Sequence, residues 1–345
     1  MTSPPKNTAP ETKSYRLFVL KNKVGMEIKI TDFGARITSI LATDRHGVLK
    51  DVLLGYSNLR TYEMDKYYLG ATVGRYANRI ARGHMTIEGG IFHLQTNNGV
   101  NHLHGGVVGF DKVLWTLKEK SGSRSIVLNY LSEDGEEGYP GNLDVEVHYE
   151  LSDDNELIIK YFATTDKPTH INLTNHSYFN LSNSPEENIT SHQLRINSKY
   201  YLPADAGNIP LGEAESVEST PFDFREMRVI GERINEDHLQ LKQGAGYDHN
   251  WILEGGQNLD DIKAELYEPV SGRKLEVYTT EPGIQFYTGN YLSYGGTSNL
   301  FGQRSGLCLE TQHFPNSPNE TSYPDTLLEP GKKFSSTTIY KFSTQ

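Results

Sequence analysis

Short runs in which apolar and polar residues alternate, separated by turn sequences, recur along most of the chain. Every second residue is apolar in 145–151, and the same pattern returns in 157–161 after the polar turn Ser152–Asn155. Alternation at period two indicates a strand with one buried face, and two such runs joined by a short turn predict a β-hairpin. A second hairpin of this kind is predicted within residues 266–280. The pattern favours a fold built mainly from antiparallel strands.

Helical patterns are short by comparison. Residues 225–234 carry Met227, Ile230 and Ile234 at helical spacing, and residues 58–63 suggest one further helical turn. Because no long amphipathic helix alternates with the strands, a doubly wound α/β fold is excluded.

We therefore predict an all-β chain that forms one large antiparallel domain, a sandwich or supersandwich, over residues 14–345. Residues 1–13, which are rich in Pro, Thr and Ser, are predicted to be a disordered tail. No composition break, linker or internal repeat divides the remainder.

Charge and cysteine content restrict the possible partners. The 33 Lys and Arg against 44 Asp and Glu give a net charge of −11, and no basic cluster interrupts it, which argues against nucleic acid or an anionic membrane. Cys308 is the only cysteine, so neither an intrachain disulfide nor a cysteine-based zinc site can form. The chain shows no signal-peptide pattern and no apolar run of membrane-spanning length. We expect a cytoplasmic protein that binds a neutral small molecule.

One stretch, residues 168–181, collects an unusual set of polar side chains. If it is read as a strand, one face carries His170, Asn172, Thr174, His176, Tyr178 and Asn180. A solvated face would be richer in Lys and Glu, so this stretch resembles the floor of a pocket for a hydroxyl-rich ligand. The alternative is a polar face that a loop covers, with every group satisfied internally.

Two further segments place polar residues beside glycines. In residues 70–80, Asn78 and Arg79 follow two glycines that permit close backbone approach, although Arg79 would equally suit a surface salt bridge. His102 and His104 lie two residues apart and would project to the same side of an extended segment. Such a pair can bind a metal, but it also occurs as ordinary hydrogen-bonding loop residues.

Two carboxylates lie beside strand-like sequence. Asp248 follows a glycine-rich turn and precedes Trp251; it is either a turn residue or an acceptor for sugar hydroxyls, with Trp251 as an aromatic wall. Glu310 lies in an apolar run that predicts a buried strand. Burial would raise its pKa toward the range of a general base, unless it is bound structurally to an arginine such as Arg79.

Taken together, the motifs resemble those of the aldose 1-epimerase (galactose mutarotase) family, in the family's order and over nearly the whole chain after the tail. The matching segments are Gly74-Arg-Tyr-Ala-Asn-Arg-Ile80, Asn101-His-Leu-His-Gly-Gly106, Gly109-Phe-Asp-Lys-Val-Leu-Trp115, Thr174-Asn-His-Ser-Tyr-Phe-Asn-Leu181, Gly246-Tyr-Asp-His-Asn250 and Glu310-Thr-Gln-His-Phe-Pro-Asn-Ser-Pro-Asn319. The resemblance implies a galactose mutarotase-like β-supersandwich with few short helices.

The resemblance also implies roles for single residues. Glu310 matches the family's general base, His176 its general acid, and His104 its other active-site histidine, near the sugar ring oxygen. The sugar-binding positions correspond to Asn78, Arg79, Asp248 and Gln285. The implied enzyme interconverts the α and β anomers of monosaccharides such as D-glucose and D-galactose, without cofactor or metal, as a monomer or homodimer.

Three other functions fit parts of the sequence. A metal-dependent β-barrel enzyme would use His102, His104 and Glu310. A sugar-binding module without catalysis would need neither a poised acid nor a base, and both Glu310 and His176 are present. A glycoside hydrolase would pair Glu310 with Asp248.

Overall fold

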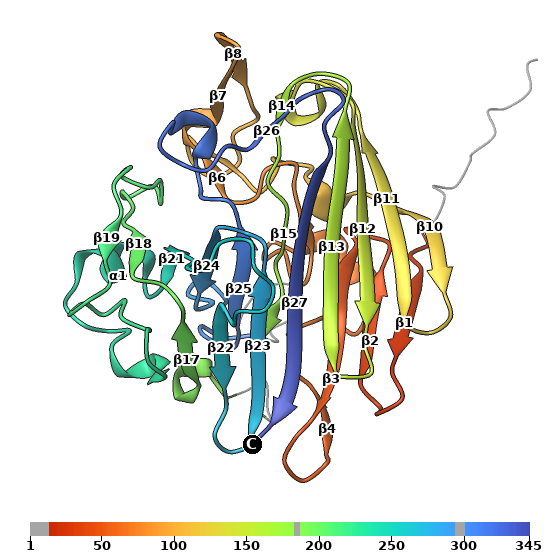
Figure 1. Ribbon diagram of the computed structural model, residues 1–345, viewed down its shortest axis with the longest axis vertical. Helices are drawn as coiled ribbons and strands as arrows, with labels where there is room; N and C mark the ends of the chain where they lie inside the picture. Colours follow the sequence, from red (N-terminus) through yellow and green to blue (C-terminus); the bar gives the residue numbers. More distant parts are fainter. Residues whose placement is uncertain (1–13, 183–186, 294–300) are drawn as a thin grey trace, which may run out of the picture.

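The computed structural model describes residues 14–182, 187–293 and 301–345; the predicted tail, residues 1–13, lies outside them. Antiparallel strands dominate the described chain, which confirms the all-β prediction (Figure 1). One α-helix, α1 (Leu239–Gly244), is present in the described part, with short 3₁₀ turns: η1 (Leu59–Met64), η2 (Ala81–Gly83), η3 (Phe110–Lys112), η4 (Glu136–Gly138), η5 (Ile189–Ser191), η6 (Ile230–Glu232) and η7 (Ser317–Asn319). No helix among these residues has the length and apolar character needed to cross a bilayer.

The largest sheet has nine strands, and the long ones run side by side in Figure 1. Their order is β10 (Thr116–Ser121), β11 (Ser125–Ser132), β12 (Leu143–Leu151), β13 (Glu156–Thr165), β27 (Phe334–Thr344), β23 (Arg273–Thr279), β22 (Ala264–Tyr267), β17 (Gln193–Ile196) and β20 (Arg228–Val229). Both predicted hairpins are confirmed, because Leu151 pairs with Leu157 and Leu266 with Leu275.

A second sheet, of six strands, carries one wall of the main cavity. Its order is β16 (Tyr178–Phe179), β25 (Leu307–Gln312), β24 (Gly283–Tyr287), β21 (Asp248–Ile252), β18 (Tyr200–Leu202) and β19 (Glu215–Ser216). Leu307, Leu309 and Phe286 of this sheet share one hydrophobic core with Val277 and Tyr340 of the nine-stranded sheet. The alternate residues of the same strands therefore face away from that core.

Smaller sheets complete the fold. A four-stranded sheet contains β1 (Leu17–Lys21), β2 (Glu27–Thr31), β3 (Arg36–Thr43) and β4 (Leu49–Asp51). Four strand pairs follow: β5 (Thr72–Val73) with β15 (Thr174–Asn175), β6 (Arg79–Ile80) with β9 (His102–Leu103), β7 (His84–Ile87) with β8 (Gly90–His93), and β14 (Thr169–His170) with β26 (Leu327–Leu328).

Residues 168–181 do not form one continuous strand as expected. They divide into β14, β15 and β16, each of which pairs with a different segment of the chain. Much of the polar face is satisfied internally, as the alternative interpretation held. The Asn172 amide donates to the carbonyls of Ala77 and His313, and the Thr174 hydroxyl donates to the carbonyl of Thr311. His176 and Tyr178 remain to line the cavity.

The prediction of a helix at residues 225–234 is wrong. The chain there forms β20, which pairs with β17, and then the single turn η6. Ile230 and Ile234 are buried as their spacing suggested, but sheet pairing decides the backbone. Gly231 in the middle of the segment also lowers its helix propensity by about 1 kcal/mol relative to alanine.

Candidate active site

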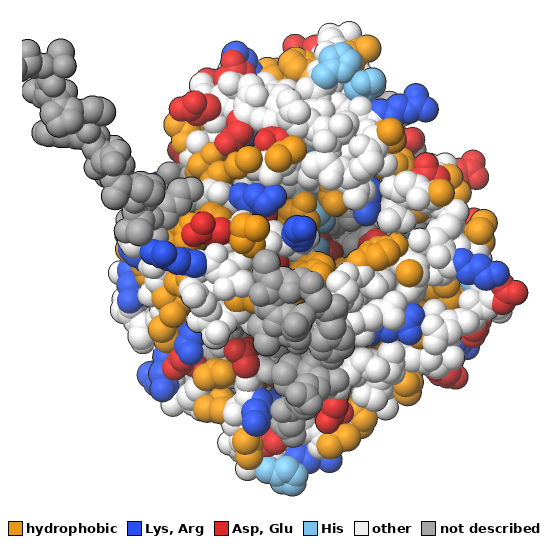
Figure 2. All heavy atoms as spheres, turned by 180° about the vertical axis from the view of Figure 1, so that it is seen from behind, with side chains coloured by type: hydrophobic (Ala, Val, Ile, Leu, Met, Phe, Trp, Pro, Cys, Tyr) orange, Lys and Arg blue, Asp and Glu red, His pale blue; other side chains and the backbone are white. Residues whose placement is uncertain are grey.

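A cavity of about 490 Å³ opens between the six-stranded sheet and the segments that connect the smaller sheets. Figure 2 shows a hollow near the middle of one face of the molecule, with basic side chains beside it. The lining residues are Lys66, Tyr67, Tyr68, Asn78, Arg79, Asn98, Leu103, His104, His176, Tyr178, Ala206, Gly207, Asn208, Asp248, Tyr287, Tyr291 and Glu310. The volume suits a small ligand, and six of these residues (Asn78, Arg79, His104, His176, Asp248 and Glu310) were singled out from the sequence as site candidates.

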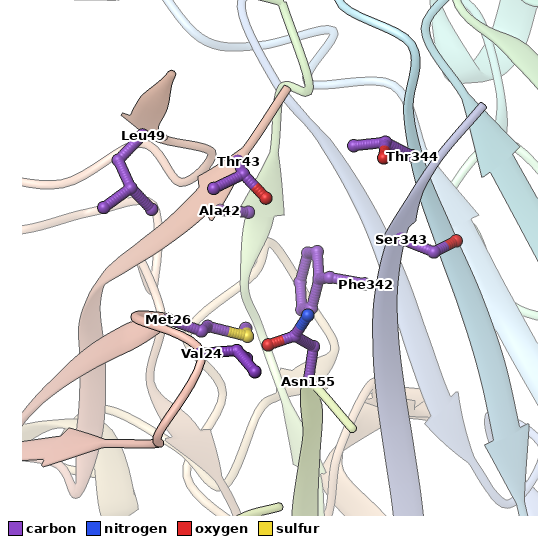
Figure 3. A pocket seen from close by; sticks show the side chains of 9 residues that line it. All are labelled: Val24, Met26, Ala42, Thr43, Leu49, Asn155, Phe342, Ser343 and Thr344. Carbon is purple, nitrogen blue, oxygen red and sulfur yellow. The ribbon is translucent and has the colours of Figure 1, made fainter. Parts of the chain in front are cut away.

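A second cavity, of about 150 Å³, lies where β27 meets the ends of β2 and β3 (Figure 3). It is lined by Val24, Met26, Ala42, Thr43, Leu49, Asn155, Phe342, Ser343 and Thr344. None of these side chains can serve as an acid or a base near neutral pH, so this cavity offers no means of proton transfer.

Strand alternation supplies the floor of the main cavity. In β25 the residues Leu307 and Leu309 enter the core, so Glu310 faces the opposite side. Gln285 of β24 lies directly across from Glu310. The Gln285 side-chain amide donates a 2.7 Å hydrogen bond to Oδ1 of Asp248 on β21, which links the side chains of these two neighbouring strands.

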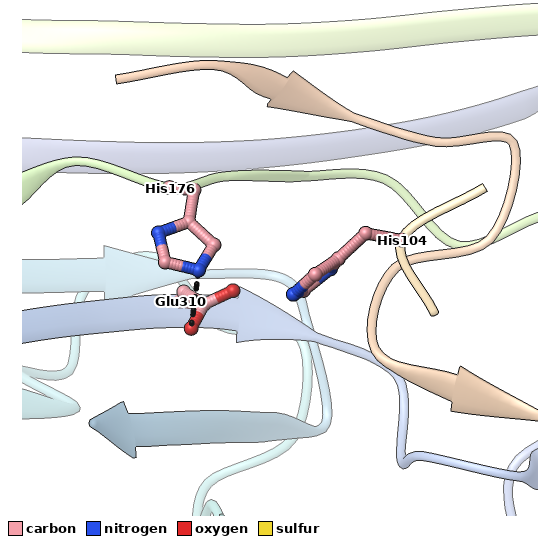
Figure 4. Close-up of side chains that lie close together, drawn as sticks. All are labelled: His104, His176 and Glu310. Carbon is pink, nitrogen blue, oxygen red and sulfur yellow. Dashed lines mark ion pairs between the residues drawn. The ribbon is translucent and has the colours of Figure 1, made fainter. Parts of the chain in front are cut away.

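Glu310 and His176 both line this cavity, and their side chains face each other (Figure 4). Glu310 Oε1 lies 3.7 Å from His176 Nε2, and the two residues are only 2% and 4% exposed. The other carboxylate oxygen, Oε2, is buried and has no hydrogen-bond partner among the described residues. Buried acceptors are rarely left unpaired in proteins, so this oxygen marks a place for a ligand hydroxyl or a water.

The surroundings of the pair disfavour separated charges. Burial raises the pKa of Glu310 well above its ordinary value; the Asp248 charge raises it further, and Arg79 opposes both. Burial lowers the pKa of His176 to about 3. Both shifts favour the uncharged forms of the two groups in this buried pair.

His104 enters the cavity from the turn after β9. Its backbone has a φ of +52°, which turns the chain and separates its side chain from that of His102. The backbone N–H of Asn78 donates a 3.1 Å hydrogen bond to His104 Nδ1. Burial, followed by the neighbouring His176 and Arg79, holds the pKa of His104 well below its usual range. Because the ring is neutral and Nδ1 accepts, its proton lies on Nε2.

This proton position bears on metal binding. His104, His176 and Glu310 bring potential ligand atoms within 4.8 Å of one another, a spacing that could hold an ion. A metal-binding histidine normally donates from its second ring nitrogen, whereas Nδ1 of His104 accepts. Its remaining nitrogen is a hydrogen-bond donor, which suits a sugar oxygen better than a cation.

Asn78 orients both His104 and the next residue, Arg79. Its side-chain oxygen accepts from the Arg79 backbone N–H at 2.9 Å, and the Arg79 guanidinium donates to Asn98 Oδ1 at 3.1 Å. Within the described residues no carboxylate forms an ion pair with Arg79, so the salt bridge considered from the sequence is not found. The guanidinium lines the cavity.

Two sequence-based candidates lie elsewhere. His102 is fully buried, and its ring nitrogens contact the carbonyl of Gln95 and the hydroxyl of Tyr139, so it does not form a pair with His104. Trp251 is also fully buried, with its indole N–H donating to the carbonyl of Phe222, and it is no cavity wall. Alternation explains this, because Trp251 lies an odd number of residues from Asp248 on β21 and takes the opposite face.

Tyrosines supply the aromatic walls that Trp251 was expected to form. The His176 ring packs beside Tyr68 and Tyr178, with ring centroids 5.8 and 5.0 Å away. The even spacing of Tyr178 from His176 already places it on the same polar face in the sequence. Tyr68 carried no such signal, because it comes from an irregular loop at φ +58° that the buried Arg36–Asp65 ion pair holds in place.

Comparison with known proteins shows clear similarity. Residues 16–341 match the family model described as aldose 1-epimerase. The chain is 43% identical to the galactose mutarotase of Homo sapiens over 321 residues, covering 92% of this chain and 91% of that protein. It is 39% identical to the aldose 1-epimerase of Escherichia coli strain K12 over 340 residues, covering 97% of both.

Solved structures agree. An aldose epimerase homologue from C. elegans matches with a TM-score of 0.88 at 27% identity, covering 96% of this chain and 99% of that one. A galactose 1-epimerase from Lactobacillus acidophilus matches with a TM-score of 0.86 at 32% identity, covering 97% and 96%. The expected galactose mutarotase-like fold is confirmed.

Proposed function

This chain belongs to the aldose 1-epimerase family, and we propose that Glu310 and His176 perform its mutarotase reaction, the interconversion of the α and β anomers of free aldoses. The observation that carries the assignment is the close, buried contact between Glu310 Oε1 and His176 Nε2, 3.7 Å apart in the polar cavity. The substrate is a monosaccharide. The single buried free cysteine, Cys308, is compatible with a reducing compartment and supports a cytoplasmic enzyme.

Anomer exchange needs one acid and one base at neighbouring atoms. Opening the ring breaks the C1–O5 bond; the C1 hydroxyl loses its proton as the carbonyl forms, and O5 takes up a proton. Because O1 and O5 are both attached to C1, the two groups must lie close together, each within about 3 Å of its oxygen. Glu310 takes the first proton and His176 gives the second. Rotation about C1–C2 and reversal of both transfers then produce the other anomer.

The proton inventory of the pair suits both directions. Ring opening starts from carboxylate and imidazolium and ends with carboxylic acid and neutral imidazole. Ring closure starts from that second arrangement, which the directions of the pKa shifts of Glu310 and His176 favour. One proton is thus exchanged between two groups, and no net charge has to enter the buried site.

The remaining polar groups can hold the sugar while C1 rotates. His104 Nε2–H and the Arg79 guanidinium donate, whereas Asp248 accepts. Gln285 carries an unpaired buried Oε1 on the same side of the sheet as Glu310. Donors and acceptors in such a mixture match neutral hydroxyl groups, which can do both.

The first test removes the two reacting groups separately. Glu310→Gln and His176→Asn should each lower kcat by roughly 10²–10⁴-fold, the usual contribution of a positioned acid or base. Polarimetry of freshly dissolved α-D-glucose and α-D-galactose measures the rate, and thermal unfolding checks the fold. His93→Asn, at an exposed position on β8, is the matched control and should keep wild-type activity. Wild-type mutarotation by either site variant would refute the assignment.

A second test concerns the sugar grip. Asp248→Ala removes a charged acceptor, a contact worth about 1.5–3 kcal/mol, and should raise KM roughly 10- to 100-fold with a smaller effect on kcat. Asp260→Ala, at an exposed position before β22, should leave KM unchanged. An unaltered KM in the Asp248 variant would remove this residue from the binding site.

A further inference from the structure

The imidazole of His176 has a second polar neighbour on the side away from Glu310. Cys308 Sγ lies 3.4 Å from His176 Nδ1, and both residues are buried. Cys308 precedes Glu310 by two residues on β25, so alternation places the thiol and the carboxylate on the same face of the strand. One strand therefore contacts both ring nitrogens of His176.

We propose that Cys308 is a positioning residue for His176, through a hydrogen bond at Nδ1 that keeps Nε2 directed at the reacting atoms. This inference rests on the proposed function of His176. His176 gives its proton to O5 from Nε2, so the neutral ring that later takes a proton back carries its remaining proton on Nδ1. In both states the Cys308 sulfur accepts from Nδ1–H, and only Nε2 gains and loses a proton in each cycle.

The aromatic contacts alone cannot fix the ring in this way. Tyr68 and Tyr178 pack beside the His176 ring at interplanar angles of 28° and 32° and restrain its plane. A half-turn about Cβ–Cγ keeps that plane but exchanges Nδ1 with Cδ2 and Nε2 with Cε1. Apolar packing barely distinguishes the two orientations, so a polar contact is needed at one edge. Within the described residues, the partners near Nδ1 are the Cys308 thiol and the backbone of His176 itself.

The environment keeps the thiol protonated. Burial raises the pKa of Cys308 well above its ordinary value, the charges of Glu310 and Asp248 raise it further, and Tyr178 opposes them through a hydrogen bond. Other groups that act on His176 are the Glu310 carboxyl at Nε2, the His104 ring at 5.3 Å and the more distant positive charge of Arg36. None of these replaces the thiol at Nδ1.

Two substitutions separate the hydrogen bond from the volume of the side chain. Cys308→Val is similar in size but can neither donate nor accept, and should lower kcat roughly 10- to 100-fold, the cost of a misplaced catalytic group, with KM within about twofold. Cys308→Ser keeps a donor and acceptor and should restore most of the lost kcat. Leu307→Val, on the core face of the same strand, should leave kcat unchanged. Equal kcat in the wild type and the valine variant would overturn the proposal.

A spectroscopic measurement tests the contact directly. Two-bond ¹⁵N–¹H correlation spectra of the wild type at neutral pH should show His176 as a single Nδ1–H tautomer, and the valine variant should show a mixture. A wild-type Nε2–H tautomer would overturn the proposal even if a variant failed to fold. The role of His176 and the role of Cys308 can be tested separately. A fully active His176→Asn enzyme would contradict the role of His176. An inactive His176→Asn enzyme together with a fully active Cys308→Val enzyme would contradict only the role of Cys308.

Discussion

Among the described residues, the buried carboxylates Glu281 and Glu310 each face an imidazole, and the geometry of the two pairs differs. Glu281 Oε2 is 2.6 Å from His313 Nδ1, whereas Glu310 and His176 are 3.7 Å apart with one carboxylate oxygen unpaired. Burial alone would lower the pKa of His313, but the charge and hydrogen bond of Glu281 outweigh it and raise that pKa. At His176 the pKa falls instead.

The difference separates a structural ion pair from a pair that can do chemistry. The His313 pair has already formed its short hydrogen bond, so its proton is held. In the Glu310 pair, one carboxylate oxygen has no hydrogen-bond partner among the described residues and can accept from a ligand. Burying this unpaired oxygen costs free energy. Glu310 and His313 lie only three positions apart in the sequence, so their surroundings alone assign them to the two classes.

The largest effects are expected when the glutamate of each pair is replaced by glutamine and both stability and kcat are measured. Glu281→Gln should destabilise the protein by about 3–5 kcal/mol, because it leaves one member of a buried ion pair without its partner, while kcat of the folded fraction stays near wild type. Glu310→Gln should reverse this, with little or no loss of stability and a large loss of kcat. Urea unfolding combined with polarimetry measures both. A Glu281 variant that keeps its stability but loses its activity would contradict this distinction between the two pairs.

A smaller effect is expected in the pH profile. The active pair holds one proton, so kcat/KM should fall as the second proton binds on the acid side, near the His176 pKa of about 3, and again on the alkaline side as the Glu310 proton leaves. The negative charge of Asp248 raises the pKa of Glu310 and the positive charge of Arg79 lowers it. Asp248→Asn should therefore move the alkaline limb to lower pH and Arg79→Gln to higher pH. Shifts of the same sign in both variants would contradict this electrostatic account.

The smallest effect concerns stability. Because the pKa of His313 is raised in the folded state, the protonated imidazole contributes stability that is fully present below its unfolded pKa of about 6.5 and is lost as pH rises through the folded value. The difference in unfolding free energy between the wild type and His313→Asn should shrink from about pH 5 to pH 9. A difference that stays constant over this range would show that charge has no part in the His313 contact.

Alternation explains which of these features could be predicted. The hairpins follow from period two, and the same period places Cys308, Glu310 and Gln312 on one side of β25. It fails in residues 168–181, where three short strands pair with three different partners and the polar side chains bond to neighbouring carbonyls. It also fails for His102 and His104, because the positive φ at His104 redirects the chain.

The sequence by itself determined the strand-rich architecture. It also supplied two carboxylates, several histidines and an arginine that can form hydrogen bonds with a sugar. Local pattern is enough for that, since it depends on residues a few positions apart. The family resemblance had already named Glu310 and His104, but only the tertiary structure showed their surroundings: Glu310 Oε2 has no partner among the described residues, and His104 lines the cavity while His102 is buried elsewhere. Those outcomes depend on partners more than twenty residues distant in the chain, such as Asn78 for His104 and His313 for Glu281, and no local periodicity encodes such contacts.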